Sequence, residues 1–284
     1  MTTTPVSRSH TAASGLSFGG VLRSEWIKLR TLRSTLWCYL IIIVITIGLG
    51  FLLAGTVNLD SSGTMDHASQ QSLWLQVATL GIGFSQLVAA VLGALMITGE
   101  YGTGMIRSTL TAVPRRWPAL TAKAIVFGLT TFVIGLVSII GTALLTAPLL
   151  PSKGVHPDFG DPAVWWGLVG GAGYLALIGL LSLSIGAIIR NSAGGIAASL
   201  GLVLVLPAVL SILAAVTRAD WARNLGTFLP GDAGGRMYAY TSGTTAQAAA
   251  GTIVLEPWQG LLVLIGWVVV LFAAAVVLLK RRDA

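Results

Sequence analysis

Residues 99–123, GEYGTGMIRSTLTAVPRRWPALTAK, form a short and densely charged segment between two long apolar runs. A helix needs about 20 apolar residues to cross the hydrocarbon core of a bilayer. The runs on either side, near 74–98 and 119–147, both reach that length. The segment therefore predicts a polar connection at one membrane surface, and the flanking runs predict an integral membrane protein.

The composition of the whole chain supports this interpretation. Of its 284 residues, 55% are hydrophobic and only 10% are charged, whereas soluble domains carry about 25% charged residues. A soluble protein of this composition would expose large apolar patches and would aggregate. The single cysteine, Cys38, excludes an intrachain disulfide and a multi-cysteine metal site.

The chain divides into a polar tail and one membrane domain, residues 21–284. Residues 1–20 are rich in Ser, Thr and Gly, so we expect them to be disordered. The remainder predicts an all-α fold with six transmembrane helices, near residues 36–56, 74–98, 119–147, 163–189, 194–216 and 258–279. Pro207 is expected to kink the fifth. Residues 217–257 are too long for a passive connection, so we expect local structure or a gate there.

Basic residues are unevenly divided between the two sides of this topology. If both termini, residues 99–118, Lys123 and residues 190–193 share one side, that side holds 13 of the 17 Lys and Arg residues. Basic residues stay on the cytoplasmic side, so we expect a multi-pass protein of the cell membrane with both termini in the cytoplasm. Membrane topology thus explains the net charge of +7 without a nucleic-acid partner.

The first membrane span is preceded by an amphipathic pattern over residues 21–35. Leu22, Trp26, Leu29 and Leu32 recur at spacings of three or four, which favours a helix with one apolar side. A cationic helix of this kind can lie flat on an anionic lipid surface, but it can equally be a cytosolic extension of the first span. The residues assigned to this interfacial helix are Arg23, Glu25, Trp26, Lys28, Arg30 and Arg33.

The apolar runs lack the groups that membrane enzymes and ion-coupled carriers need. None has Asp, Glu, Lys, Arg or His near its centre, which disfavours a secondary carrier, an intramembrane protease and a metal site. The chain also lacks a phosphate-binding G-x-x-x-x-G-K-[ST] loop. We therefore expect no catalytic residue, cofactor or metal on this chain. Gln76, Ser85 and Gln86 are candidates for a substrate path, although hydrogen bonding between helices is the more ordinary role for such residues.

Two stretches carry a family resemblance. The segment GEYGTGMIRSTLTAVPRRW resembles the loop of bacterial type-two ABC exporter permeases, with a Glu-Tyr pair, a Gly-Thr-x-Arg-like run, and a proline followed by basic residues. RSEWIKLRTLRSTLW, residues 23–37, is similar to the interfacial connecting helix that opens chains of that family. The sequence Gly104-Met105-Ile106 departs from the more usual Gly-Thr-Ile.

The resemblance implies a permease subunit of an exporter, driven by a separate cytosolic ATPase that holds ATP and Mg. It implies a coupling helix around Glu100–Leu110, and a second permease subunit, identical or different, to complete the pore. It also implies that residues 217–257 contribute to an extracellular gate. The residues expected to couple to the ATPase are Glu100, Tyr101, Gly104, Met105, Arg107, Leu110, Arg115 and Arg116. The alternatives are a secondary carrier and a non-transporting scaffold or sensor-complex subunit, and the transported substrate stays open.

Overall fold

The structure is a computed structural model that describes residues 17–57, 65–104, 116–218, 220–241 and 252–281. These residues form helices joined by short connections, without a β-strand among them. The α-helices are α1 (Phe18–Thr31), α2 (Arg33–Thr56), α3 (His67–Thr79), α4 (Ile82–Gly102), α6 (Arg116–Thr146), α7 (Pro162–Ile189), α8 (Ser192–Leu200), α9 (Leu206–Thr217), α10 (Asp220–Thr227), α11 (Pro230–Gly235) and α12 (Pro257–Arg281). Shorter turns are η1 (Pro151–Lys153), η2 (Gly201–Val205) and η3 (Arg236–Tyr238).

Six helical segments of the described chain are long and apolar enough to cross a membrane, which confirms the predicted all-α membrane fold. They are Arg33–Thr56, His67–Gly102, Trp117–Thr146, Pro162–Ile189, Ser192–Thr217 and Pro257–Arg281. The second segment is longer than the expected 74–98 because it includes the polar first turns of α3, which begins at His67. It bends at Leu80–Gly81, between α3 and α4. Gly81 allows this bend to touch α2, because a Cβ there would lie 2.4 Å from Thr46 Cα.

The amphipathic helix differs from its expected range of 21–35. Ser17 caps α1 by accepting a hydrogen bond from the Gly20 N–H at 3.2 Å, so the helix begins earlier than the apolar pattern does. It ends at Thr31, because Leu32 adopts an extended backbone before α2 starts at Arg33. Leu32 continues the apolar spacing of three or four residues, so the sequence pattern does not predict that the helix ends there.

The fifth span contains an irregular turn close to its proline. A π-helical turn, η2, fills residues 201–205 and ends two residues before Pro207. Proline lacks the amide hydrogen that would continue the helical ladder, and such bulges form where the ladder is interrupted. Residues 217–257 carry the local structure that their length indicates, since α10, α11 and η3 lie within them. Residues 242–251 of that segment are outside the described part.

Helix α7 lies at the centre of the bundle, with 72% of its most apolar window buried, against 11% for α12. It packs most closely on α4. A Cβ at Gly93 of α4 would lie 2.2 Å from the Gly179 carbonyl oxygen of α7, so the two backbones are almost in contact. Small residues at a helix interface permit this approach in a membrane, where packing rather than the hydrophobic effect joins helices.

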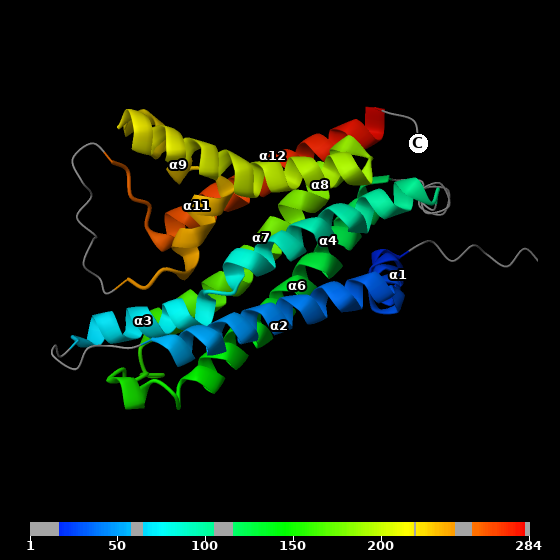
Figure 1. The fold of residues 1–284 in the computed structure, drawn as a ribbon. Coiled ribbons are helices and arrows are strands. Elements are labelled where there is room, and N and C mark those ends of the chain that lie inside the picture. Colours follow the sequence, from blue (N-terminus) through cyan, green and yellow to red (C-terminus); the bar gives the residue numbers. More distant parts are fainter. Residues whose placement is uncertain (1–16, 58–64, 105–115, 219, 242–251, 282–284) are drawn as a thin grey trace, which may run out of the picture.

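The two ends of the bundle collect different connections (Figure 1). Helix α1, the end of α4, the start of α6, the α7–α8 turn and the end of α12 lie at one end, which we call the α1 end. The start of α3, the end of α9, η3 and the start of α12 lie toward the opposite end. The charge pattern of the sequence predicts that the α1 end faces the cytoplasm.

Candidate coupling site

Helix α1 turns one narrow face toward the bundle. Val21, Glu25 and Leu29 are buried and follow one another at intervals of four, which places them on one side of a helix. Trp26 is 45% exposed, and the Arg30 guanidinium lies 6.0 Å from its ring. The buried face of α1 therefore carries a carboxylate, Glu25, into the interior of the protein.

Glu25 belongs to a closed ring of four alternating charges, which we call the ion ring: Glu25, Lys28, Glu100 and Lys123. The Lys123 Nζ lies 2.7 Å from Glu25 Oε2 and 2.9 Å from Glu100 Oε1. The Lys28 Nζ lies 2.8 Å from Glu25 Oε1 and 3.1 Å from Glu100 Oε1. Because Glu100 lies in the last turn of α4 and Lys123 lies in the second turn of α6, the ring joins three helices at the α1 end.

The ion ring is electrically balanced and mostly shielded from water. The side chains of Glu25 and Lys123 are only 3% and 5% exposed, whereas that of Lys28 is 26% exposed. Burial alone would raise the pKa of Glu25, but the charge and hydrogen bonds of Lys123 and Lys28 together lower it below its usual range. Burial opposes the charge of Lys28, yet its hydrogen bond to Glu25 and the nearby Glu100 raise its pKa. Glu25 and Lys28 are therefore charged at neutral pH.

One atom of the ring is not satisfied within the described residues. Glu100 accepts both lysines through Oε1, while its buried Oε2 has no hydrogen-bond partner there. A buried carboxylate oxygen without a donor costs free energy, so it favours any motion that supplies one. This atom lies in the last turn of α4, at the first residue of the region that the family resemblance assigns to the coupling helix.

Arg190 makes a second set of contacts between helices at the α1 end. Arg190 ends α7 in a left-handed conformation, with φ of 60°, and its guanidinium lies 5.2 Å from the Tyr101 ring. Its Nη2 also donates to the Leu278 carbonyl oxygen of α12 at 3.4 Å. Arg190 thus connects α7 and α12 to the residue that follows Glu100.

The structure brings together only some of the residues that the sequence analysis selected. Glu25, Lys28 and Glu100 meet in the ion ring, and Tyr101 meets Arg190. Gly104 has φ of 72°, a conformation that favours glycine, and no atom within 4 Å of an added Cβ. The residues Arg23, Trp26, Arg30 and Arg33 are exposed. Arg116 starts α6, whereas Met105, Arg107, Leu110 and Arg115 lie outside the described residues.

Lys123 and Arg190 contribute to the candidate site but were not among the residues selected from the sequence. The sequence places Lys123 at the start of a span and Arg190 in a turn, where each was used only to assign the membrane topology. The only available signal is that Lys123 sits several residues inside an otherwise apolar run. A lysine in that position needs a partner, because a buried charge without one is costly.

The three candidates for a substrate path face different neighbours. Ser85 is buried and its Oγ lies 2.9 Å from Thr46 Oγ1, so it joins α4 to α2. Gln86 accepts a hydrogen bond from the Tyr174 hydroxyl of α7. Gln76 is exposed on α3 and donates to Ser72 at 3.4 Å. Ser85 thus makes the helix-to-helix bond that is ordinary for such residues, and a path through these three stays a prediction.

The described part of the chain contains no cluster of three or more His, Cys, Asp or Glu residues that could hold a metal ion. Each charged group of the ion ring pairs with two groups of opposite sign. The arrangement suits a mechanical link between helices.

Comparison with known proteins identifies the family of the chain. A search of curated proteins found no match. The sequence profile of the ABC-2 family of transporter proteins matches residues 20–284, which is nearly the whole chain and includes both the amphipathic helix and every span. The chain belongs to the ABC-2 family and is a membrane permease subunit of an ABC transporter.

Proposed function

We propose that this chain exports a substrate from the cytoplasm and is driven by a separate ATPase that docks at the α1 end. The permease resides in the cell membrane, with both termini in the cytoplasm. Six spans form half of a pore, so a second permease subunit, identical or different, completes it. ATP and Mg are held by the ATPase, and this chain holds neither.

The observation that carries the proposal is the position of the ion ring. In the sequence, residues 105–115 connect α4 to α6, and the ring joins the last turn of α4 to the first turns of α6. A force applied to that connection reaches both helices at once. Glu25 and Lys28 extend the link to α1, so three helices move as one body.

Transport requires that this body have two stable arrangements. ATP shifts the equilibrium only if the complex binds it with different affinity in the two states. Rigid-body tilting of packed helices is a common way to convert such a difference into opening at a distant end. The close α4–α7 contact then transmits the tilt from the α1 end to the centre of the bundle.

The proposal is tested by affinity purification of the tagged chain from native membranes in mild detergent. We expect an ATPase to copurify with the wild-type chain and to be lost or uncoupled in Glu100→Ala and Arg107→Ala. Arg223→Ala is a matched control, because Arg223 is an exposed arginine on α10, away from the α1 end. That variant should retain the ATPase.

The competing function is a non-transporting scaffold or sensor-complex subunit. If wild-type chain yields no ATPase under conditions that preserve other membrane complexes, the export proposal is wrong. If an ATPase copurifies but its ATP turnover is independent of this chain, the scaffold function gains support.

A further inference from the structure

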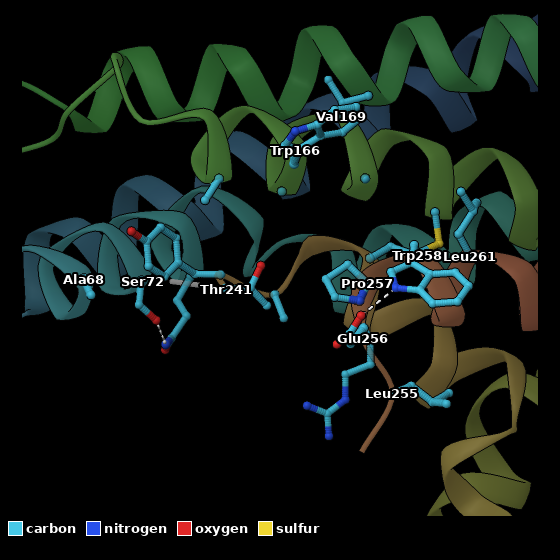
Figure 2. Close-up of a pocket in the computed structure, with 18 of the residues that line it drawn as sticks. Ala68, Ser72, Trp166, Val169, Thr241, Leu255, Glu256, Pro257, Trp258 and Leu261 are labelled. Carbon is cyan, nitrogen blue, oxygen red and sulfur yellow. Dashed lines mark hydrogen bonds between the residues drawn. The ribbon is translucent and has the colours of Figure 1, made fainter. Parts of the chain in front are cut away.

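A large pocket lies toward the opposite end of the bundle, far from the ion ring. Its volume is about 1530 Å³, and its walls come from α3, α7, η3 and residues 254–261 at the start of α12. Figure 2 shows Ser72 and Thr241 on one side of the open space, Trp166 and Val169 on a second, and Glu256 with Trp258 on a third. Sites for small molecules usually measure about 300–1,000 Å³, so this pocket is large enough for a bulky molecule.

The walls include two tryptophans close to the ends of candidate membrane spans. Trp166 and Trp258 are 75% and 58% exposed, while Phe132 and Met237 contribute apolar surface. Tryptophan prefers the interface between lipid and water, and these two residues stand near the ends of their spans. A ligand with a large apolar body can therefore enter from the lipid or leave to it.

The polar part of the pocket carries two carboxylates and one guanidinium among neutral side chains. Asp66 and Glu256 line it directly, and Arg236 is the one lysine or arginine among the described lining residues. The hydroxyl of Tyr240, another wall residue, donates to Asp161 Oδ2 at 2.7 Å. Burial raises the pKa of Tyr240 to about 12, and the carboxylates of Asp161, Asp66 and Asp158 act in the same direction.

Glu256 is oriented by the aromatic wall. The indole Nε1 of Trp258 donates to Glu256 Oε2 at 2.6 Å, which places a carboxylate at the edge of an aromatic ring (Figure 2). Within the described residues, the side chain of Glu256 has no salt-bridge partner. A carboxylate beside an exposed aromatic face is a favourable environment for an organic cation, because both attract positive charge.

We propose that this pocket binds amphipathic organic cations, with the apolar body against Trp166 and Trp258 and the cationic centre beside Glu256 and Asp66. Its identification as a cargo site rests on the proposed export function. Binding itself does not, because the pocket belongs entirely to this chain and needs no ATPase. Binding and coupling can therefore be tested separately.

The test uses two probes of nearly the same shape and opposite charge, tetraphenylphosphonium and tetraphenylborate. Equilibrium dialysis measures their binding to the purified chain in nanodiscs, with empty nanodiscs of the same lipids subtracted. We expect saturable binding of the phosphonium cation. The double variant Asp66→Asn/Glu256→Gln should bind it about ten-fold more weakly, since two exposed ion pairs are lost. Arg236→Gln should tighten binding about two- to five-fold, because the one repelling charge is removed.

Asp220→Asn is the matched control: it removes an exposed carboxylate on α10 that pairs with Arg223 at 3.6 Å and is absent from the pocket wall. Its affinity should equal that of the wild type. Several results would overturn the proposal: no saturable phosphonium binding, equal weakening by the control and the double variant, or preferred binding of tetraphenylborate that is lost in Arg236→Gln. An ATPase that copurifies with a chain unable to bind the cation would refute this inference alone. Cation binding without an ATPase would refute the cargo role.

Discussion

Replacing Lys123 by methionine should destabilise the protein more than the same replacement of Lys28, although both remove one positive charge from the ion ring. The side chain of Lys123 is 5% exposed and contacts two carboxylates, at 2.7 and 2.9 Å. Lys28 makes contacts of 2.8 and 3.1 Å but is 26% exposed, so water can replace it in part. The two variants differ mainly in how well the remaining charges can be hydrated.

The magnitude follows from the charge that each variant leaves behind. Removing one partner of a buried ion pair costs about 3–5 kcal/mol, because the other charge stays buried without compensation. Lys123→Met leaves Glu25 and Glu100 sharing one lysine, so its free energy of unfolding should fall by about that amount. For a chain of this size, the apparent melting temperature should then fall by roughly 6–20 °C. Lys28→Met should cost about 1 kcal/mol, as solvent-accessible pairs do.

The assay is scanning fluorimetry of each variant in nanodiscs at pH 7. The double variant Glu25→Gln/Lys123→Met removes one charge of each sign and leaves the Lys28–Glu100 pair, so it should recover at least half of the loss. Two results would refute the reasoning. One is equal destabilisation by the two single lysine variants. The other is a double variant whose loss is the sum of its two single losses, since an interacting pair is not additive.

Three further predictions concern packing, a loop anchor and pH. Gly93→Val should lower the free energy of unfolding by about 1–3 kcal/mol because the valine side chain would meet the α7 backbone. Gly83→Val is also on α4, but nothing lies within 4 Å of an added Cβ there, so this variant should cost less. The apparent melting temperatures of the two variants test this difference. Gln71→Leu should cost about 1–3 kcal/mol by the same measurement, because the buried Gln71 amide bonds two backbone groups of the α6–α7 connection. The folded-state pKa of Glu25 is lowered, so its stabilisation is complete above its usual value of 4.5 and is lost as pH falls through the lower value. Wild type should therefore lose stability more steeply below pH 4.5 than Glu25→Gln does, and parallel curves would contradict this.

The sequence predicts the number of spans because a membrane imposes a length of apolar chain that is read directly from composition. It predicts an interruption of the helical ladder at Pro207 because that residue lacks an amide hydrogen, and the π-helical turn η2 lies beside it. The break at Leu32 is not predictable in this way, since Leu32 fits the apolar pattern and only the entry angle of α2 requires an extended residue. The bend at Leu80–Gly81 depends on contact with α2, which is a tertiary effect.

The candidate site was predictable as a set of charges but not as a ring. Glu25, Lys28 and Glu100 are conspicuous because they border apolar runs. Their convergence with Lys123 depends on how α1 packs across α4 and α6, and 98 residues separate Lys123 from Glu25 in the chain. The cationic side of α1, which the sequence emphasises, remains exposed, and the contact with the bundle is made by the one buried carboxylate of that helix.

The central claim is that the ion ring transmits nucleotide-driven motion from the α1 end to the opposite end. The most direct measurement is the labelling rate of a cysteine at Thr241, an exposed residue at the opposite end, in a Cys38→Ser background. The permease and its copurified ATPase are reconstituted in nanodiscs and labelled with and without ATP and vanadate. The account predicts that nucleotide changes the labelling rate in the wild-type ring. It also predicts that Glu25→Gln/Lys123→Met abolishes this response while the ATPase remains bound. An unchanged response in that folded, ATPase-bound double variant would contradict the account.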